Sequence, residues 1–376
     1  MKTEETMELA AMLADLEELV LCESFSADHE AVTRSAAVVA AQGARLTGTA
    51  PEVLTVSGVT HLSWTFGTPR VLLVGHHDTV WPMGSLATHP WSVTDGIARG
   101  PGVFDMKAGL VQMFHALGSL PSPEGVRVLV TGDEEVGSTT SRALIEEAAR
   151  GCAATFVLEA SADGGALKTA RKGTSWYEVE VLGKAAHAGL EPEKGVNAAV
   201  EAARQILAVD ALAEVVDTSH GYDGSWRTTV TPTVLAAGST GNTVPARATF
   251  QVDVRVPALA AQRQVDELLR ALTARTPGAS LRVRGGPNRP PLEREASAAL
   301  FTLAQEAAAR LGLPPLTAAA VGGASDGNFT AGAGCPTLDG LGAVGGGAHA
   351  DDEHVVVDTM PVRAALLAEL ITAARG

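Results

Sequence analysis

The stretch VLLVGHHD, residues Val71–Asp78, is the most informative part of this sequence of 376 residues. Its apolar run, closed by Gly75, is typical of a short strand that is buried on both faces. Such strands build parallel sheets, and α/β proteins carry their functional groups at the carboxyl ends of those strands. His76, His77 and Asp78 follow the run directly, so we expect a functional site at this strand end.

Two further apolar runs end on acidic residues. Val126–Thr131 precedes the triplet DEE at 133–135, and residues 153–158 precede Glu159. The carboxyl ends of parallel strands lie at one edge of a sheet. We therefore expect these acidic side chains to lie near His76.

Between these runs, residues 106–117 and 138–149 have the apolar periodicity of helices. Strands that alternate with helices of this length are typical of a parallel sheet with helices packed on it. The fold class that we predict is α/β, with a mainly parallel, helix-covered sheet.

A second pattern begins after about Lys172. Residues 175–182 alternate between apolar and polar side chains, as in a sheet with one exposed face, and helical and β-like segments follow. We expect a smaller, inserted α+β domain, from which the chain returns through a linker at Pro287–Pro291. The predicted domains are a main domain of residues 1–172 and 287–376 and an inserted domain of residues 173–286.

The residues at the predicted strand ends offer the nitrogen and oxygen ligands that suit zinc, cobalt or manganese. Extended backbone places His76 and Asp78 on the same side, so the imidazole would bind a metal and the carboxylate would orient it from behind. Asp105 follows a Gly-Pro-Gly turn. It is the best-placed carboxylate to bridge two metal ions, and a helix cap is the alternative.

Three adjacent carboxylates at 133–135 are costly at a strand end unless a cation lies among them. One glutamate of this triplet would be a metal ligand and its neighbour a general base, with an exposed acidic turn as the alternative. Glu159 would serve a second metal. A further ligand is expected from the glycine-rich segment 345–354, where the local sequence favours His349 over His354.

The composition limits the partners and the location of the protein. A formal net charge of −15 argues against nucleic acid and anionic membranes, which both require a basic surface. No apolar run approaches the ~18 residues of a membrane span, and the acidic segment 1–20 does not have the pattern of an export signal. Three widely spaced cysteines indicate a reducing compartment. We expect a cytoplasmic protein.

Together these segments resemble the dizinc hydrolases of the aminoacylase and carboxypeptidase family. Its members include acetylornithine deacetylase, succinyl-diaminopimelate desuccinylase and glutamate carboxypeptidase. The resemblance runs from about Leu13 to Leu370. It is closest to the glutamate carboxypeptidase branch, through GPGVFDMK at 100–107, Glu159 at a terminal ligand position and GGASDG at 322–327.

The resemblance implies two metal ions, with zinc expected and cobalt or manganese as alternatives. It assigns two sets of ligands that share one carboxylate: His76, Asp105 and Glu159, and Asp105, Glu135 and His349. Asp78 would support His76, and Glu134 would take the proton of the attacking water. Met106 departs from the acidic residue that many members have there, after a peptide bond that is cis in the family.

The inserted domain resembles the lid and dimerisation domain of the family. The segment GKAAHAG at 183–189 matches the one whose histidine steadies the tetrahedral intermediate, so His187 would take that role, from the neighbouring subunit of a homodimer. Asn242 and Arg255 match positions in the substrate pocket, and Arg289 is similar to an arginine that grips a substrate carboxylate. A strand-end ion pair for Arg255 and a linker charge for Arg289 are the alternatives.

The function that follows is hydrolysis of an amide or peptide bond next to a carboxylate-bearing amino acid, in an acidic dipeptide or an N-acyl amino acid. A deacylase of N-acyl amino acids would use the same catalytic residues and differ only in its pocket. A metal-bound binding module without activity would need Glu134 or a ligand to be missing, and none is missing.

Overall fold

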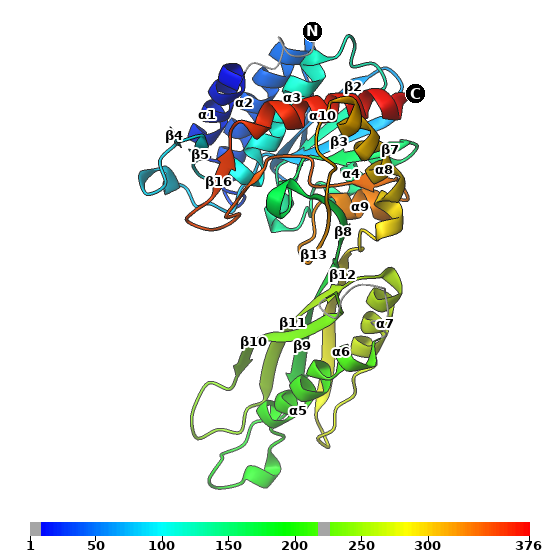
Figure 1. Ribbon diagram of the computed structural model, residues 1–376. Helices are drawn as coiled ribbons and strands as arrows, with labels where there is room; N and C mark the ends of the chain where they lie inside the picture. The colour runs from blue at the N-terminus through cyan, green and yellow to red at the C-terminus, as the bar shows by residue number, and fades with distance from the viewer. Residues whose placement is uncertain (1–8, 217–225) are drawn as a thin grey trace. The chain divides into compact units, whose positions relative to one another are not determined.

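The computed structural model describes residues 9–216 and 226–376 (Figure 1). The chain divides into two compact units. Unit 1 contains the chain up to Ala170, Leu292–Val321 and Ser325–Gly376, and unit 2 contains Arg171–Pro291 and Gly322–Ala324. Among the described residues, no helix is long and apolar enough to cross a membrane.

Unit 1 is built on a six-stranded sheet. Its strands lie in the order β1 (Glu52–Val56), β2 (Val59–Phe66), β6 (Val126–Thr131), β3 (Val71–His76), β7 (Ala154–Val157) and β14 (Thr337–Leu338). β6, β3, β7 and β14 are parallel, and β2 runs antiparallel to both of its neighbours. The predicted α/β class with a mainly parallel sheet is confirmed.

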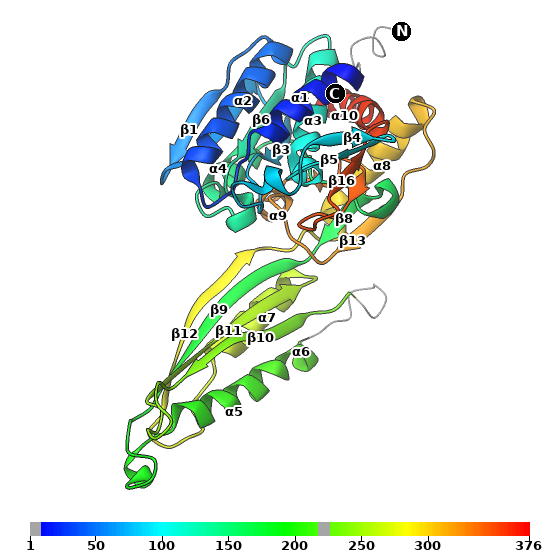
Figure 2. The ribbon, with the colours of Figure 1, turned by 90° about the vertical axis from the view of Figure 1, so that its left-hand side faces the viewer.

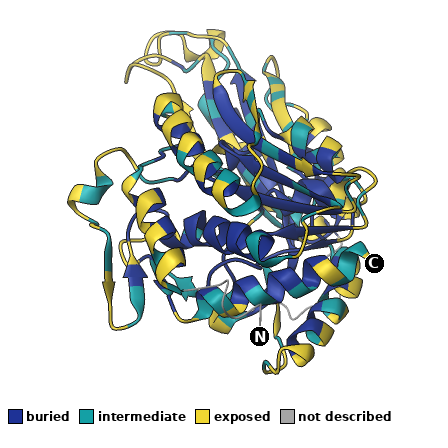
Figure 3. Ribbon diagram, turned by 90° about the horizontal axis from the view of Figure 1, so that it is seen from above, coloured by how far each residue is buried: buried dark blue, intermediate teal, exposed yellow. Residues whose placement is uncertain are grey.

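Helices cover both faces of this sheet. Both faces are apolar, since β3 sends alternate side chains to two separate cores. Val71 and Leu73 join the larger core, whereas Leu72 and Val74 join the smaller one. The larger core takes residues from α1 (Leu9–Leu21), α2 (His29–Thr47), α3 (Ala108–Ser119), α8 (Arg294–Arg310) and α10 (Thr359–Arg375). The smaller core takes residues from α4 (Arg142–Ala149) and α9 (Gly327–Gly332). Figure 3 shows the buried central strands and the exposed outer sides of the helices.

A small antiparallel sheet in unit 1 was not predicted from the sequence. Its strands lie in the order β15 (Gly345–Gly346), β16 (His354–Val356), β5 (Ile97–Arg99) and β4 (Ser92–Thr94). The pairing of β16 with β5 brings the glycine-rich segment 345–354 beside the chain that leads to Asp105. A two-stranded sheet, β8 (Leu167–Arg171) with β13 (Ala318–Val321), completes the sheets described for this part of the chain.

Unit 2 is a four-stranded antiparallel sheet with helices packed against one face (Figure 2). The strand order is β10 (Thr229–Ala237), β11 (Arg247–Val256), β9 (Gly173–Leu182) and β12 (Ser280–Arg289). Tyr177, Val179 and Val181 of β9 pack with α5 (Ala198–Asp210) and α7 (Leu259–Arg270). The short helix α6 (Leu212–Val215) follows α5. Trp176, on the opposite face, is 42% exposed, as the alternation predicted.

The linker predicted at Pro287–Pro291 is largely part of a strand, because β12 continues to Arg289. β12 is an edge strand, where a proline need not donate to a neighbour. The pairing with β9 also shifts register between Pro287 and Arg289, as expected where the ladder is interrupted. The proline pattern therefore indicated a strand irregularity, and unit 1 resumes only at Leu292.

Candidate metal centre

Three parallel strands deliver acidic and histidine side chains to one edge of the unit 1 sheet. His76 is the last residue of β3, the turn Glu134–Val136 follows β6, and Glu159 lies two residues beyond β7. β3 pairs in parallel with both β6 and β7. The carboxyl ends of the three strands therefore meet, as the sequence predicted.

Asp105 lies between two histidines. Its Oδ1 is 3.3 Å from His76 Nε2, and its Oδ2 is 3.4 Å from His349 Nε2. His76 Nε2 is also 3.5 Å from Glu159 Oε1, and His349 Nε2 is 3.2 Å from Glu135 Oε2. A carboxylate that reaches a different histidine with each oxygen has the position that a bridging ligand needs. The peptide bond from Asp105 to Met106 is cis, as the resemblance implied.

Asp78 holds the backbone of Glu134 and Glu135 and the ring of His76 in place. Its buried carboxylate accepts the backbone N–H groups of Glu134 and Glu135, both at 3.2 Å, and the hydroxyl of Ser26 at 2.7 Å. The Nδ1 of His76 lies 3.0 Å from the Asp78 carbonyl oxygen and 3.5 Å from the carboxylate. With its proton on Nδ1, the ring presents the lone pair of Nε2, which is the form that binds a metal.

Three buried atoms of the cluster make no hydrogen bond, although His76 Nε2 and Asp105 Oδ1 lie within ion-pair distance of each other. His76 Nε2, Asp105 Oδ1 and Glu135 Oε1 are buried and have no hydrogen-bond partner among the described residues. An unsatisfied buried polar group costs about 1–3 kcal/mol, and a cation would satisfy all three. The donor atoms of His76, Asp105 and Glu135 lie within 4.8 Å of one another, as do those of His76, Glu134 and Glu159. These residues fit divalent metal ions.

The electrostatics of the cluster also fit a cation. Burial alone would lower the pKa of His76, but Asp105, Asp78 and Glu159 raise it well above its ordinary value. Asp105 and Glu135 likewise raise the pKa of His349, and burial raises the pKa of Glu135. The carboxylates thus favour positive charge at this position, which a bound cation would supply.

The acidic triplet divides into one structural residue and two that belong to the cluster. Asp133 accepts the backbone N–H and hydroxyl of Thr140, at 2.7 and 2.8 Å, and the hydroxyl of Ser141 at 2.5 Å. It therefore stabilises the loop before α4. Glu134 is 8% exposed and lies next to Glu135, beside the candidate metal ligands.

The competing histidines lie outside the cluster. His77 is buried with its Nε2 3.1 Å from the carbonyl oxygen of Thr60, and burial lowers its pKa to about 4. His354 belongs to β16, and its Nδ1 lies 2.8 Å from the carbonyl oxygen of Asp352. The structure brings His349, rather than His354, to the carboxylates.

Two buried carboxylates near the centre were missed by the sequence reasoning. Asp326 accepts hydroxyls of Thr131, at the end of β6, and Ser138, beyond the glutamate turn, at 2.9 and 2.5 Å. Glu353 accepts backbone N–H groups of the loop that carries Asp105. Both lie in glycine-rich segments, which were the only signal available.

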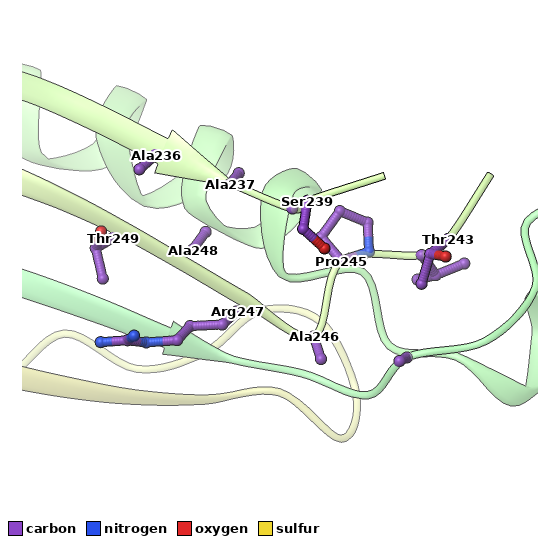
Figure 4. Close-up of a pocket in the computed structure, with 12 residues that line it drawn as sticks. Ala236, Ala237, Ser239, Thr243, Pro245, Ala246, Arg247, Ala248 and Thr249 are labelled. Atoms are coloured by element: carbon purple, nitrogen blue, oxygen red, sulfur yellow. The ribbon is translucent and has the colours of Figure 1, made fainter. Parts of the chain in front are cut away.

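Unit 2 brings two of its predicted functional residues together at one end of the sheet. Ala188 N donates to the carbonyl oxygen of Asn242 at 2.9 Å, and His187 pairs with Thr243 in an isolated bridge. His187 Nδ1 accepts the N–H of Gly189 at 3.1 Å, so Nε2 carries the proton of the neutral ring. A cavity of about 370 Å³, lined by Arg247, Pro245 and otherwise mostly short side chains, adjoins this segment (Figure 4).

Arg255 and Arg289 lie at the opposite end of the same sheet. Both pair with Thr174 of β9, one from each side. Arg255 donates through Nε and Nη2 to the two oxygens of Asp253, both at 2.8 Å, so a substrate carboxylate would have to displace this ion pair. Arg289 is only 6% exposed.

Comparison with known proteins identifies the family of this chain. Residues 72–373 match the model of peptidase family M20/M25/M40. Carboxypeptidase G2 of Pseudomonas sp. (strain RS-16) is 35% identical over 81% of this chain and 74% of the relative. Succinyl-diaminopimelate desuccinylase of Acidiphilium cryptum is 27% identical over 81% and 83%. A metallo-carboxypeptidase of family M20 from Sulfolobus solfataricus has the same fold, with a TM-score of 0.73 at 17% identity over 97% and 99% of the two chains.

The chain belongs to the peptidase family M20/M25/M40. It is a metal-dependent hydrolase of amide or peptide bonds, and the resemblance noted in the sequence is confirmed.

Proposed function

We propose that this hydrolase removes a carboxylate-bearing amino acid from an amide or peptide bond, as a glutamate carboxypeptidase does, and that it uses two divalent cations. The observation that carries the proposal is the position of Asp105 between His76 and His349, where buried polar atoms make no hydrogen bond. Zinc suits this mixture of imidazole and carboxylate ligands, with cobalt and manganese as alternatives. The identity with carboxypeptidase G2 supports a carboxypeptidase activity.

The chain's own residues would divide the chemistry as follows. His76, Asp105 and Glu159 would hold one ion, and Asp105, Glu135 and His349 the other. Bound there, the ions would act as Lewis acids on water and on the scissile carbonyl. Glu134 accepts the proton of the attacking water and returns it to the leaving amine, while Asp78 keeps His76 in its ligand tautomer.

The spacing within unit 2 supports a role for a second subunit. His187 and Asn242 lie beyond the Leu182 end of β9, whereas Arg255 and Arg289 lie at Thr174. These two positions on the strand are roughly 26 Å apart at about 3.3 Å per residue, too far for one small substrate. We infer that His187, as the oxyanion donor, and Asn242 serve the centre of a partner chain, and that Arg289 binds the substrate carboxylate.

A surface suited to such pairing exists on unit 2. β10 is an edge strand, and it exposes 67% of Val234 and 60% of Leu235. On α5, Leu207 is 72% exposed. Apolar side chains beside an open strand edge favour association with a second copy, so we propose a homodimer formed through unit 2.

The three cysteines are free, which supports a reducing, cytoplasmic location.

Deacylation of N-acyl amino acids is the second candidate activity. It is favoured by the similarity to succinyl-diaminopimelate desuccinylase over four fifths of this chain.

Purified enzyme loaded with zinc or cobalt should be assayed against C-terminal glutamate and aspartate dipeptides, their neutral counterparts and a series of N-acyl amino acids. A carboxypeptidase of the proposed kind should give the highest kcat/KM with an acidic C-terminal residue. Preference for short acyl groups, whatever amino acid they carry, would instead establish the deacylase.

A further inference from the structure

Glu353 is a buried carboxylate with four hydrogen-bond donors around it. It is 4% exposed. Its Oε1 accepts the backbone N–H groups of Phe104 and Asp105, at 2.8 and 3.0 Å, and its Oε2 accepts that of Gly102 at 3.0 Å and the indole N–H of Trp81 at 2.6 Å. A carboxylate has about four lone-pair sites, so these donors use its whole capacity. Glu353 is therefore no ligand for a metal ion itself.

Three of these donors belong to the loop that presents Asp105. Gly102 has a left-handed backbone (φ 71°), and a Cβ at this position would lie 2.4 Å from the Thr79 side chain. The loop is thus closely confined on one side, and its N–H groups converge on Glu353 on the other. Because the Asp105 N–H is itself one of the donors, Glu353 acts on the backbone of the residue that touches both histidines.

Glu353 and His349 belong to the same turn of the chain. Backbone hydrogen bonds from Ala350 to Gly347 and from Glu353 to Ala350, at 2.9 and 3.0 Å, make residues 347–353 a compact turn. His349 stands near the start of that turn and Glu353 at its end. The turn thus contacts Asp105 twice, through the imidazole at 3.4 Å and through the carboxylate at 3.0 Å from the backbone nitrogen.

We propose that Glu353 is a positioning residue that fixes the distance between Asp105 and His349, and so the geometry of the ion that these two residues share. This inference rests on the proposed two-metal centre. Outer partners of metal ligands commonly change metal affinity 10–100-fold when they are altered. Glu353 differs from Asp78, which orients His76, because it acts on the shared carboxylate and on the opposite histidine.

The decisive variant is Glu353→Gln, which keeps the size of the side chain but turns an amide N–H₂ toward donors. Cobalt titration of the metal-free protein should show two ions bound by the wild type. In Glu353→Gln the affinity for one ion should fall at least 10-fold, with a changed visible spectrum of the bound cobalt, while the circular dichroism spectrum stays that of the wild type. The kcat should fall about 10-fold or more with little change in KM, because substrate contacts remain.

Asp351→Asn is the matched control, since Asp351 belongs to the same turn and its side chain is 94% exposed. It should bind cobalt as the wild type does. A second test uses Glu353→Ala, in which the four N–H groups that Glu353 accepts lose their acceptor. Glu353 lines a cavity of about 190 Å³ together with Trp81 and His89. Formate should enter there and restore cobalt affinity in part, whereas chloride should not.

Unchanged cobalt affinity and spectrum in Glu353→Gln would overturn the inference, as would a failure of formate to restore Glu353→Ala. If Glu353→Gln does not fold, Glu353→Asp keeps the charge and shortens its reach, and wild-type cobalt binding in that variant would also overturn it. A wild type that binds fewer than two ions would instead refute the two-metal function, which separates the two failures.

Discussion

Glu134 and Glu135 are adjacent, yet the structure gives them different neighbours. Glu135 lies 3.2 Å from His349, whereas the carboxylate of Glu134 lies within 4.8 Å of His76 and Glu159. If Glu134 is the general base, Glu134→Ala should keep close to two metal ions per chain and lower kcat by about 10²–10⁴-fold. Metal analysis and steady-state kinetics test this.

Glu135→Ala is the comparison for that experiment, because it should lose metal together with activity. A Glu134→Ala protein that lost its metal while Glu135→Ala retained it would show that the two roles are reversed.

A carboxylate of unit 2 predicts an effect of pH on stability. Glu201 of α5 is fully buried and accepts N–H groups of Arg275 and Thr276, both at 2.8 Å, and the Gln205 amide at 2.7 Å. Burial would raise its pKa, but these donors and the Thr276 hydroxyl lower it to about 2. The stability that the carboxylate contributes is present above its ordinary pKa of 4.5 and is lost as pH falls from there toward 2.

Glu201→Gln should therefore lower the free energy of unfolding by about 1–3 kcal/mol at pH 7. The difference from the wild type should shrink as the pH is lowered below 4.5. Urea unfolding at several pH values measures it, with the exposed Glu193→Gln as control. A difference independent of pH would mean that the lost contacts, rather than the charge, carry the effect.

At the scale of elements, α3 packs closely against the chain at the end of β7, and this packing holds Glu159 in place. A Cβ added at Gly109 of α3 would lie 2.1 Å from the carbonyl oxygen of Leu158, the residue before Glu159. Alanine favours helix over glycine by about 1 kcal/mol, but relieving such an overlap costs typically 1–3 kcal/mol and occasionally more. Because backbone must move, the second effect should win.

Gly109→Ala should therefore be less stable than the wild type and should bind metal more weakly, since the displaced strand end carries a ligand. Thermal unfolding and cobalt titration measure the two effects. Gly118→Ala, in the same helix, places its Cβ 3.1 Å from the Leu46 oxygen and should cost less. Equal or greater stability of Gly109→Ala would show that the strand end yields without cost.

At the scale of the whole molecule, the proposal that His187 serves a partner chain can be tested by mixing subunits. His187→Ala chains lack the oxyanion donor, and Glu134→Ala chains lack the base, so each homodimer should have a much lower kcat. A mixed dimer contains one centre in which both residues are intact. Activity should rise after subunit exchange, toward about a quarter of the wild-type value for a random 1:1 mixture, because half of the dimers are mixed.

Exchange is confirmed by mass spectrometry of differently tagged chains, and His187→Ala mixed with itself is the control. Absence of recovery after confirmed exchange would place His187 in its own chain's centre or outside catalysis.

The sequence by itself determined the class of fold and the residues that meet at the candidate metal centre. Buried strands read as apolar runs, and groups at their carboxyl ends must meet once the strands are parallel, so His76, Glu134, Glu135 and Glu159 could be brought together in advance. Asp105 and His349 were found from their local motifs. The alternation of Trp176 with its neighbours likewise predicted a sheet with one open face.

Only the tertiary structure decided which polar residues support that centre. The sequence favoured the two glutamates of the acidic triplet, but only the fold gives Asp133 its role, because its carboxylate accepts the hydroxyls of Thr140 and Ser141. The role proposed for Glu353 depends on hydrogen bonds from backbone N–H groups some 250 residues earlier in the chain. The pairing of β5 with β16 brings these groups to it. Pairing between short, irregular strands leaves no periodic signal, because few side chains alternate, so such long-range hydrogen bonds appear only when the chain is folded.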